Sequence, residues 1–440
     1  MKKIIAALIL PVFLAGCAFM GPPKGLSQSV LEEAKRQIRS KGPVPLTAGV
    51  MKVEITPPVG TPLAGYSKRR SNPSTGIRDP LYVRTVVLSD GEDTVVLVSA
   101  DLLLFPNPLA NSIVDKLWKE LKIPRRAIIL TGTHTHSGAG SIASEFLYEI
   151  VFGRYRGDVA EGIAARVTWA VRQALEHQEL IRWGVAEQKR LLFGLTENRM
   201  AMTGFVDPAL SVFLVESMDG HPLAVLVNAA AHPTLMDSQD LRFSADYPGE
   251  LARVIETTYP RAVCLFMNGA AGDLRPRGDI GTTPDERIRR FGQALAEGTV
   301  GMINQMSFQT KGNLAAWGRQ IQLPPPQLHL GPIPVHPGIG QFMRPVSLYQ
   351  NLVALDDVIF VPLQGEMTAD LGWDLKLKLS AQGLHPLLLG YANGYFGYAV
   401  TPKQYKNGSY EAWMTWYGPD FGEFLIQKIQ QLVDLYSTKK

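Results

Sequence analysis

Cysteine is nearly absent from this chain of 440 residues, which contains only Cys17 and Cys264. Cys17 lies in an apolar N-terminal segment, so the sequence excludes a disulfide framework as the source of stability. Cys264 stands inside the apolar run "AVCLFM" and is predicted to be a small buried hydrophobic residue. The fold must therefore be stabilised by a large apolar core.

Blocks of like charge, repeats and low-complexity segments are absent as well. The 44 basic and 40 acidic side chains give a net charge of only +4, so nucleic-acid binding has no electrostatic support. The N-terminal apolar run is too short to span a bilayer. With 46% apolar residues, the chain has the composition of a globular protein with enough material for one large domain.

The N-terminus "MKKIIAALILPVFLAGC" has the pattern of a secretion signal, with two lysines, an apolar run and small residues before Cys17. Its "LAGC" ending resembles the lipobox of bacterial lipoproteins, in which the cysteine is acylated. An ordinary cleaved signal with an incidental cysteine is the alternative. We expect a lipoprotein signal over residues 1–17, a tether over 18–45 containing "GPPKG" and "KGPVP", and a folded domain over 46–440. The predicted location is the bacterial cell envelope, at the periplasmic face of the outer membrane.

Short aliphatic runs that stop at a polar residue alternate with longer amphipathic segments in the rest of the chain. This alternation predicts an α/β fold, a single large domain with a central mixed β-sheet flanked by helices. The polar residues lie at the C-terminal ends of the predicted strands, where ligands bind in open α/β sheets. The runs are "TVVLVSAD", "AIILTGTHTH", "LAVLVNAAAH", "AVCLFMNGAAGD", "VIFVPLQGE" and "PLLLGYANGYFGY". We expect their six polar ends to converge on one crevice.

Two helices are predicted, over residues 159–178 and 282–298. The first has apolar residues at helical spacing. The second has Thr283 as N-cap, a proline in the first turn and Glu286 to complete a capping box. Asp101 could be a cap or an acceptor behind the site. The same two roles are open to Asp246, which precedes another helical segment, and there the cap is favoured.

His134 and His136 end the run "AIILTGTHTH". Residues two apart on a strand point to the same face, so both imidazoles could reach one site. Zinc suits imidazole and carboxylate ligands, but a pair of hydrogen-bonded histidines at a strand end explains the motif equally well. The motif by itself leaves both interpretations open.

Six segments together carry a resemblance to a known family: "THTHSGAG", "NAAAHPT", "NGAAGD", "QGEMT", "NGYFGY" and "YKNGSYE". In type, order and separation they resemble the neutral/alkaline ceramidase family, from about Val53 to Gly418. The resemblance implies a zinc amidase site. The zinc ligands that it implies are His134, His232, Glu366 and Tyr398.

The same resemblance assigns the neighbours of the metal. His136 is expected beside the zinc as acid, base or a partner of a ligand. Arg199 in "TENRM" corresponds to an arginine that faces the substrate, and Tyr410 matches a nearby site tyrosine.

Each assignment has a structural alternative. His232 could be a hydrogen-bonded histidine at a strand end, and Glu366 a helix N-terminal charge favoured by the dipole. Tyr398 could pack as one more aromatic ring. Arg199 could pair with Glu197 or another acid at the surface.

The chain departs from the family in two respects. The loop "GDLRP" has Arg275 where the sphingolipid-cleaving members have a serine, and the chain stops without the β-sandwich domain that follows the catalytic domain in the full-length enzymes. A guanidinium cannot replace a serine as nucleophile, although it could bind a carboxylate or phosphate in a bidentate way. We therefore expect Arg275 to favour acidic substrates, with neutral ceramide a poor one.

The predicted function is zinc-dependent hydrolysis of a linear amide by metal-activated water. An N-acyl lipid is the first candidate substrate and another cell-envelope amide the second. A non-catalytic envelope lipoprotein that binds a lipid or glycan through the same crevice is an alternative. Phosphatase or esterase chemistry at the same site is a further one.

The lipobox yields a direct test. Replacing the acylated cysteine in Cys17→Ser should release the protein from bacterial membranes, because acyl chains on this residue would be the anchor. Membrane fractionation with mass spectrometry of the N-terminus measures this. Wild-type protein found soluble in the periplasm with an unmodified N-terminus would contradict the prediction.

Overall fold

A computed structural model describes residues 42–145, 148–201, 204–330, 333–334 and 344–437. The predicted signal, Cys17 and most of the tether lie outside these residues. Within them, no helix combines the length and the apolar character needed to cross a membrane.

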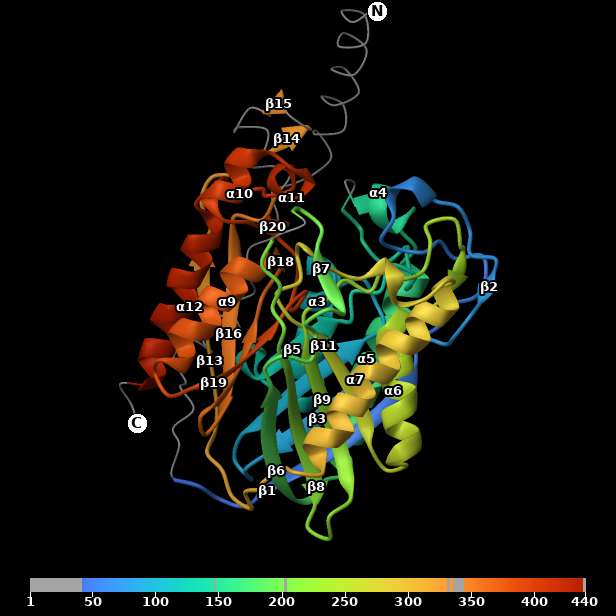
Figure 1. Ribbon diagram of the computed structural model, residues 1–440. Helices are drawn as coiled ribbons and strands as arrows, with labels where there is room; N and C mark the ends of the chain where they lie inside the picture. The colour runs from blue at the N-terminus through green and yellow to red at the C-terminus, as the bar shows by residue number, and fades with distance from the viewer. Residues whose placement is uncertain (1–41, 146–147, 202–203, 331–332, 335–343, 438–440) are drawn as a thin grey trace, which may run out of the picture.

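The larger of the two main sheets has eight strands and a mixed topology (Figure 1). Its edges are parallel pairs, β11 with β9 and β4 with β5, and the strands between them pair antiparallel. Its apolar strands bury both faces, as covered sheets do. In spatial order the strands are β11 (Val263–Asn268), β9 (Pro222–Ala229), β8 (Leu210–Ser217), β6 (Glu179–Gln188), β1 (Leu46–Glu54), β3 (Tyr82–Ser89), β4 (Thr94–Ala100) and β5 (Ile128–Gly132).

A second sheet of four strands packs on the first. Its order is β13 (Leu314–Gln322), β16 (Ser347–Leu355), β17 (Val358–Pro362) and β19 (His385–Leu389). The ring of Phe213 on β8 meets that of Phe360 on β17 edge to face, with centroids 5.2 Å apart. Asn228 on β9 donates to the carbonyl of Leu388 on β19 across the same interface.

The central mixed sheet is therefore confirmed, and the second sheet was not predicted. Its runs "VIFVP" and "PLLLG" were correctly identified as strands but were assigned to a single sheet. Aliphatic runs indicate strands, whereas long-range pairing decides which sheet each strand joins.

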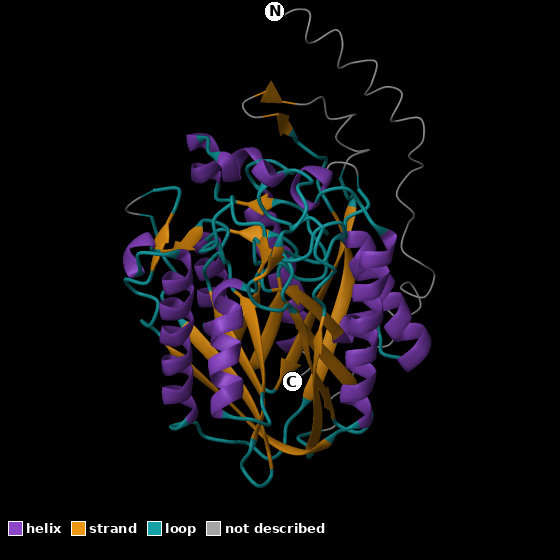
Figure 2. Ribbon diagram, turned by 90° about the vertical axis from the view of Figure 1, so that its right-hand side faces the viewer, coloured by secondary structure: helices purple, strands orange, loops and turns teal. Residues whose placement is uncertain are grey.

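Helices cover the outside of both sheets (Figures 1 and 2). α5 (Gly157–Glu176) lies on β1 and β3, with α3 (Asn107–Leu121) beside it, and α6 (Asp246–Thr258) and α7 (Pro284–Ile303) cover β11 and β8. α9 (Ala369–Ser380) and α12 (Phe421–Ser437) cover the four-stranded sheet. The order of layers is helices, large sheet, small sheet, helices.

Short elements occupy the loops around the layers. They are the 3-10 turns η1 (Ser67–Arg69), η2 (Arg125–Ala127) and η4 (Gly278–Ile280), the strands β2 (Gly76–Ile77), β7 (Thr196–Asn198), β10 (Arg242–Phe243), β12 (Leu274–Pro276), β14 (His329–Leu330), β15 (Ile333–Pro334), β18 (Glu366–Met367) and β20 (Tyr398–Ala399), and the helices α4 (Glu149–Phe152), α10 (Pro402–Asn407) and α11 (Tyr410–Trp413).

The two helices expected from the sequence are present as α5 and α7. Thr283 caps α7 by accepting from the backbone N–H of Glu286. The capping box differs from the prediction, because the Glu286 carboxylate accepts from the N–H and hydroxyl of Thr282 rather than from Thr283. The first turn of α7 is anchored in either arrangement.

One of the six polar strand ends does not reach the crevice. Asp101, directly after β4, accepts from Arg84 at 2.9 Å and from the N–H of Tyr82 at 2.8 Å, and its side chain is fully buried. Burial raises the pKa of Asp101, against the lowering effect of the Arg84 guanidinium. Glu256 on α6 also contacts Arg84, so this ion pair joins the sheet to a covering helix.

Removing one partner of this buried pair should be costly. We expect Arg84→Met to lower the free energy of unfolding by about 3–5 kcal/mol, because the Asp101 carboxylate would stay buried without its cation. Chemical denaturation measures the change. As a control, Arg172→Met breaks the exposed pair with Glu120 and should cost less than about 1 kcal/mol. An equal loss in the free energy of unfolding for the two variants would contradict the stabilising role of the Arg84–Asp101 pair.

Candidate metal centre

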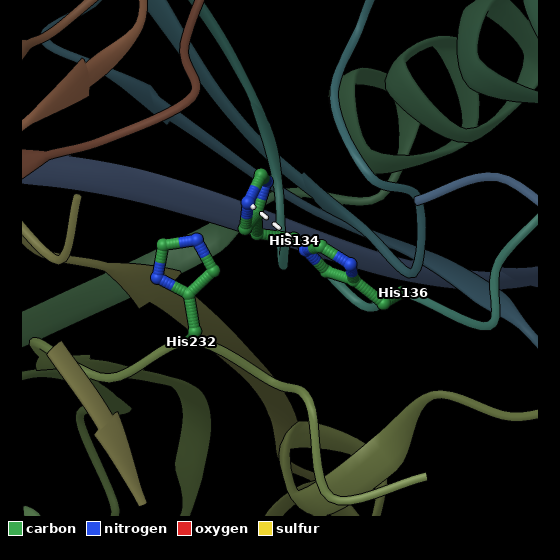
Figure 3. Close-up of side chains that lie close together, drawn as sticks. All are labelled: His134, His136 and His232. Atoms are coloured by element: carbon green, nitrogen blue, oxygen red, sulfur yellow. Dashed lines mark hydrogen bonds between the residues drawn. The ribbon is translucent and has the colours of Figure 1, made fainter. Parts of the chain in front are cut away.

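Three imidazoles meet at one point of the interior (Figure 3). One ring nitrogen of each of His134, His136 and His232 lies within 4.8 Å of the corresponding nitrogens of the other two. His134 and His136 follow β5, and their Nε2 atoms are 3.4 Å apart. His232 approaches from the loop after β9.

The two histidines after β5 converge in a different way from the prediction. They lie in a loop and not on a strand, and His134 has a φ of +71°, in the left-handed region. This turn, and not the strand period of two, brings the rings together. The conformation is uncommon for a residue with a side chain, and such positions concentrate at functional sites.

The second ring nitrogen of two imidazoles is fixed by the backbone. His134 Nδ1 lies 2.8 Å from the carbonyl oxygen of Leu103, and His232 Nδ1 lies 2.6 Å from that of Ala271. Because a carbonyl only accepts, both Nδ1 atoms carry the proton and both Nε2 atoms present a lone pair to the centre. This is the arrangement found around metal-ligating histidines.

Glu366 brings a carboxylate to the same point. Its Oε2 atom lies 3.0 Å from Nε2 of His232 and 3.5 Å from Nε2 of His134. Burial alone would raise the pKa of Glu366, but the two imidazoles hold it well below its ordinary value. Imidazole lone pairs thus face a carboxylate oxygen, and a cation between them would satisfy all of them.

The position of Glu366 corrects the alternative drawn from the sequence. Glu366 opens the short strand β18, which pairs in parallel with β20, and α9 begins only at Ala369. The carboxylate is therefore aimed by a strand pair and is not a helix N-terminal charge. The same pairing places Glu366 opposite Tyr398.

Aromatic rings fix two of the imidazoles. Tyr391 stacks on His134 with centroids 3.6 Å apart, and Tyr66 lies 4.9 Å from His136. At Gly65, which has a φ of +110°, a Cβ atom would stand 2.7 Å from Cγ of His136. The sequence analysis missed both tyrosines. Tyr391 stands in the same run as the tyrosine motif, whereas no sequence signal marks Tyr66.

A second set of polar side chains stands behind Glu366. The hydroxyl of Tyr395 donates to Oε1 of Glu366 at 2.7 Å, and Tyr398 also bonds to this carboxylate. Arg199 donates to the Tyr398 hydroxyl at 2.8 Å and to Glu411 at 2.9 Å. The acid that pairs with Arg199 is thus Glu411 and not Glu197. Tyr395 and Glu411 lie within the quoted motifs but received no role from the sequence.

Burial and neighbouring charges determine the protonation states in this set. Burial would lower the pKa of Arg199, but Tyr398, Glu366 and Glu411 raise it, so the guanidinium keeps its charge. Burial and Glu366 raise the pKa of Tyr398 well above its ordinary value. The pKa of Tyr410 rises to about 12 for the same two reasons.

His136 differs from the other two imidazoles. Burial and the neighbouring His134 and His232 hold its pKa well below the ordinary value, so the ring is neutral. Its Nδ1 atom is buried without a hydrogen-bond partner among the described residues. The neutral ring therefore keeps a lone pair on one of its two nitrogens.

The loop after β11 contributes Asp273 to the surroundings of the centre, but not Arg275. Asp273 accepts from the N–H of Ala369 and from Asn198, and burial raises its pKa to about 6. Arg275 lies on β12 and pairs with Glu197 on β7 at 2.8 Å, with half of its side chain exposed. The structure thus separates Arg275 from the imidazoles.

Asp246 is not the helix cap that the sequence predicted. The N-cap of α6 is Ala245, and Asp246 is the first helical residue. Its carboxylate accepts from the backbone N–H groups of Leu235 and Met236. Asp246 therefore fixes the loop that follows His232.

A pocket of about 510 Å³ opens beside the imidazoles. His136 and Arg199 form part of its wall, and Tyr410 stands at its side. The lining residues are Gly65, Tyr66, Ser67, Lys68, His136, Arg199, Thr234, Leu235, Met236, Asp237, Ser238, Pro284, Arg287 and Tyr410. Its volume suits a small-molecule group.

Fold and site together define a mixed α/β protein with a buried imidazole–carboxylate centre that could hold a metal ion. The sequence profile of the neutral/alkaline non-lysosomal ceramidase family, N-terminal part, matches residues 46–283, just over half of the chain. The protein belongs to this family. Glu366, Tyr398 and Tyr410 lie beyond the matched residues.

Two curated relatives have low but extended similarity. The neutral ceramidase of Drosophila melanogaster is 21% identical over 313 residues, which cover 59% of this chain and 44% of that protein. The neutral ceramidase of Mycobacterium tuberculosis (strain ATCC 25618 / H37Rv) is 23% identical over 253 residues, covering 51% and 39%. The chain thus aligns with less than half the length of either relative.

Solved structures extend the likeness to the second half of the chain. A crystal structure of neutral ceramidase from Pseudomonas aeruginosa has a TM-score of 0.77 at 18% identity, covering 88% of this chain and 74% of that one. A ceramidase complexed with C2 has a TM-score of 0.75, also at 18% identity, covering 87% and 74%. At this identity the likeness concerns the fold.

The centre predicts metal binding that depends on His232. Protein purified from zinc-sufficient cells should carry about one zinc ion per chain, and His232→Ala should lose it because a buried ligand is removed. Elemental analysis measures both.

As the matched control, His177→Ala removes an exposed imidazole at the end of α5 and should leave the metal content unchanged. Metal-free wild-type protein after zinc-sufficient expression would refute the assignment.

Proposed function

We propose that this protein is a zinc-dependent hydrolase of linear amides, with an N-acyl lipid of the ceramide type as its substrate class. One observation carries the proposal: imidazole lone pairs face a buried carboxylate with no proton donor between them. Family membership supports the amide as the bond that is cleaved. The names of the relatives support the lipid.

The donor set of the centre suits a divalent cation such as zinc. The residues that would hold it are His134, His232, Glu366 and Tyr398. When bound, zinc would polarise the amide carbonyl and lower the pKa of a water molecule. Tyr395 would keep Glu366 oriented by its 2.7 Å hydrogen bond, as partners of metal ligands do.

The remaining side chains would move the proton and stabilise charge. Neutral His136 could take a proton from the attacking water and return it to the leaving amine. Arg199 keeps its charge beside Tyr398 and would stabilise the phenolate form of that ligand. Tyr410 lines the pocket and is 56% exposed as a residue, and its hydroxyl could donate a hydrogen bond to the developing oxyanion.

We also propose that the protein acts at the bacterial cell envelope, held by acyl chains on Cys17. The support is the sequence pattern around "LAGC" alone. Anchoring would keep the enzyme close to amides that partition into lipid.

Hydrolysis of N-dodecanoyl amides, with release of dodecanoic acid measured by mass spectrometry, tests the reaction. Chelation should abolish the activity, and zinc should restore it. Arg199→Met should lower kcat by about 10²–10³-fold, the range for losing one preorganised electrostatic contact to the reacting centre.

The matched control is Arg166→Met, which removes an exposed guanidinium from α5 and should leave kcat unchanged. Zinc-loaded protein that releases no fatty acid from any linear amide would contradict the proposed function.

A further inference from the structure

Polar side chains contribute much of the lining of the pocket beside His136. Five of its lining residues carry hydroxyl groups, namely Tyr66, Ser67, Thr234, Ser238 and Tyr410. Leu235 and Met236 also line it but are almost wholly buried, at 7% and 1% exposure. With polar atoms on about half of its lining, the pocket can hold a polar head group.

The pocket also carries a surplus of positive charge. Lys68, Arg199 and Arg287 line it, against one carboxylate, Asp237. Arg199 already donates hydrogen bonds to Glu411 and Tyr398.

Lys68 and Arg287, the other two cations of the pocket, are not neutralised by neighbouring carboxylates. Neither Lys68 nor Arg287 forms an ion pair with a carboxylate among the described residues, and the Arg287 side chain donates only to the carbonyl of Thr283. The Asp237 carboxylate accepts from the N–H of Gln239, which folds it back on its own loop. Among the described residues, two cations of the pocket therefore have no carboxylate partner.

Both cations stand on anchored segments. Lys68 lies in η1 between Tyr66 and Arg69. Arg69 is 2% exposed and donates to the backbone carbonyls of Ser238, Asp237 and Asp240 across the pocket. Arg287 lies in the first turn of α7, whose N-terminus is capped by Thr283. A bound anion would meet charges whose backbone is already fixed.

We infer that this pocket binds an anionic head group, a carboxylate, sulfonate or phosphate, on the amine side of an N-acyl amide. Lys68 and Arg287 would bind the anion, with hydroxyl donors beside them, and the amide would lie toward the imidazoles. The inference deepens the proposed function and rests on it. It also replaces Arg275 as the source of acidic preference, since Arg275 is paired with Glu197 and does not line the pocket.

Two substrates of equal acyl length test the inference. N-dodecanoylglycine presents a carboxylate next to the amide, and N-dodecanoylethanolamine presents a hydroxyl group in its place. We expect kcat/KM to favour the glycine amide by about 10- to 100-fold, the range for one charged hydrogen bond, and to do so less at high salt. The double variant Lys68→Gln/Arg287→Gln should lose the preference, mainly through a raised KM for the glycine amide.

Matched controls come from the same segments. Arg70→Gln/Arg289→Gln removes two exposed cations, one next to η1 and one in α7, that do not line the pocket, and it should keep the preference. Arg275→Gln should keep it too. Equal use of both amides by wild type, or an equal loss of preference in the control variants, would overturn the inference.

The experiment distinguishes failure of the proposed reaction from failure of the inferred anion site. If neither amide is hydrolysed, the proposed reaction is wrong, and calorimetric binding of the same two compounds decides about the pocket. Preferential binding of the glycine amide that is lost in Lys68→Gln/Arg287→Gln supports the anion site. Equal binding of both compounds to wild type overturns it.

Discussion

The rest of this structure depends on one unfavourable juxtaposition, the meeting of imidazole lone pairs with the carboxylate of Glu366. His134 and His232 each use Nδ1 to donate to a backbone carbonyl, so both turn an acceptor toward the same oxygen. Acceptors that face each other in a buried place repel unless a cation or proton lies between them. Holding them together requires rigid surroundings, and the loops around the centre supply them.

The rigidity comes largely from side chains that bind backbone. Asp246 holds the loop after His232, and Arg69 binds carbonyl groups of the loop at Asp237 and of His136. At Gly272, a Cβ atom would stand 2.7 Å from the carbonyl oxygen of Glu366, so the glycine lets these two backbone segments approach. These contacts fix the centre from three directions and define the pocket wall at the same time.

Sequence reasoning succeeded where the signal was local. The aliphatic runs, the α/β class, the α7 N-cap at Thr283 and the identity of the converging residues all follow from short-range pattern or from motif resemblance. It failed where contacts between distant segments of the chain determine which residues pair. Asp101 was expected at the crevice but binds Arg84, because residues far apart in the chain compete as partners. The sequence left the acid that pairs with Arg199 open, and the structure gives the distant Glu411.

By itself the sequence determined which chemical groups are available and where strands and helices form, since both depend on residue type and periodicity. Only the tertiary structure decided that the strands form two stacked sheets and that a left-handed turn at His134 aims its ring at Glu366. It also decided that Arg275 faces solvent while Lys68 and Arg287 line the pocket. The physical reason is that pairing, burial and charge neutralisation are set by neighbours in space, which residue order does not specify.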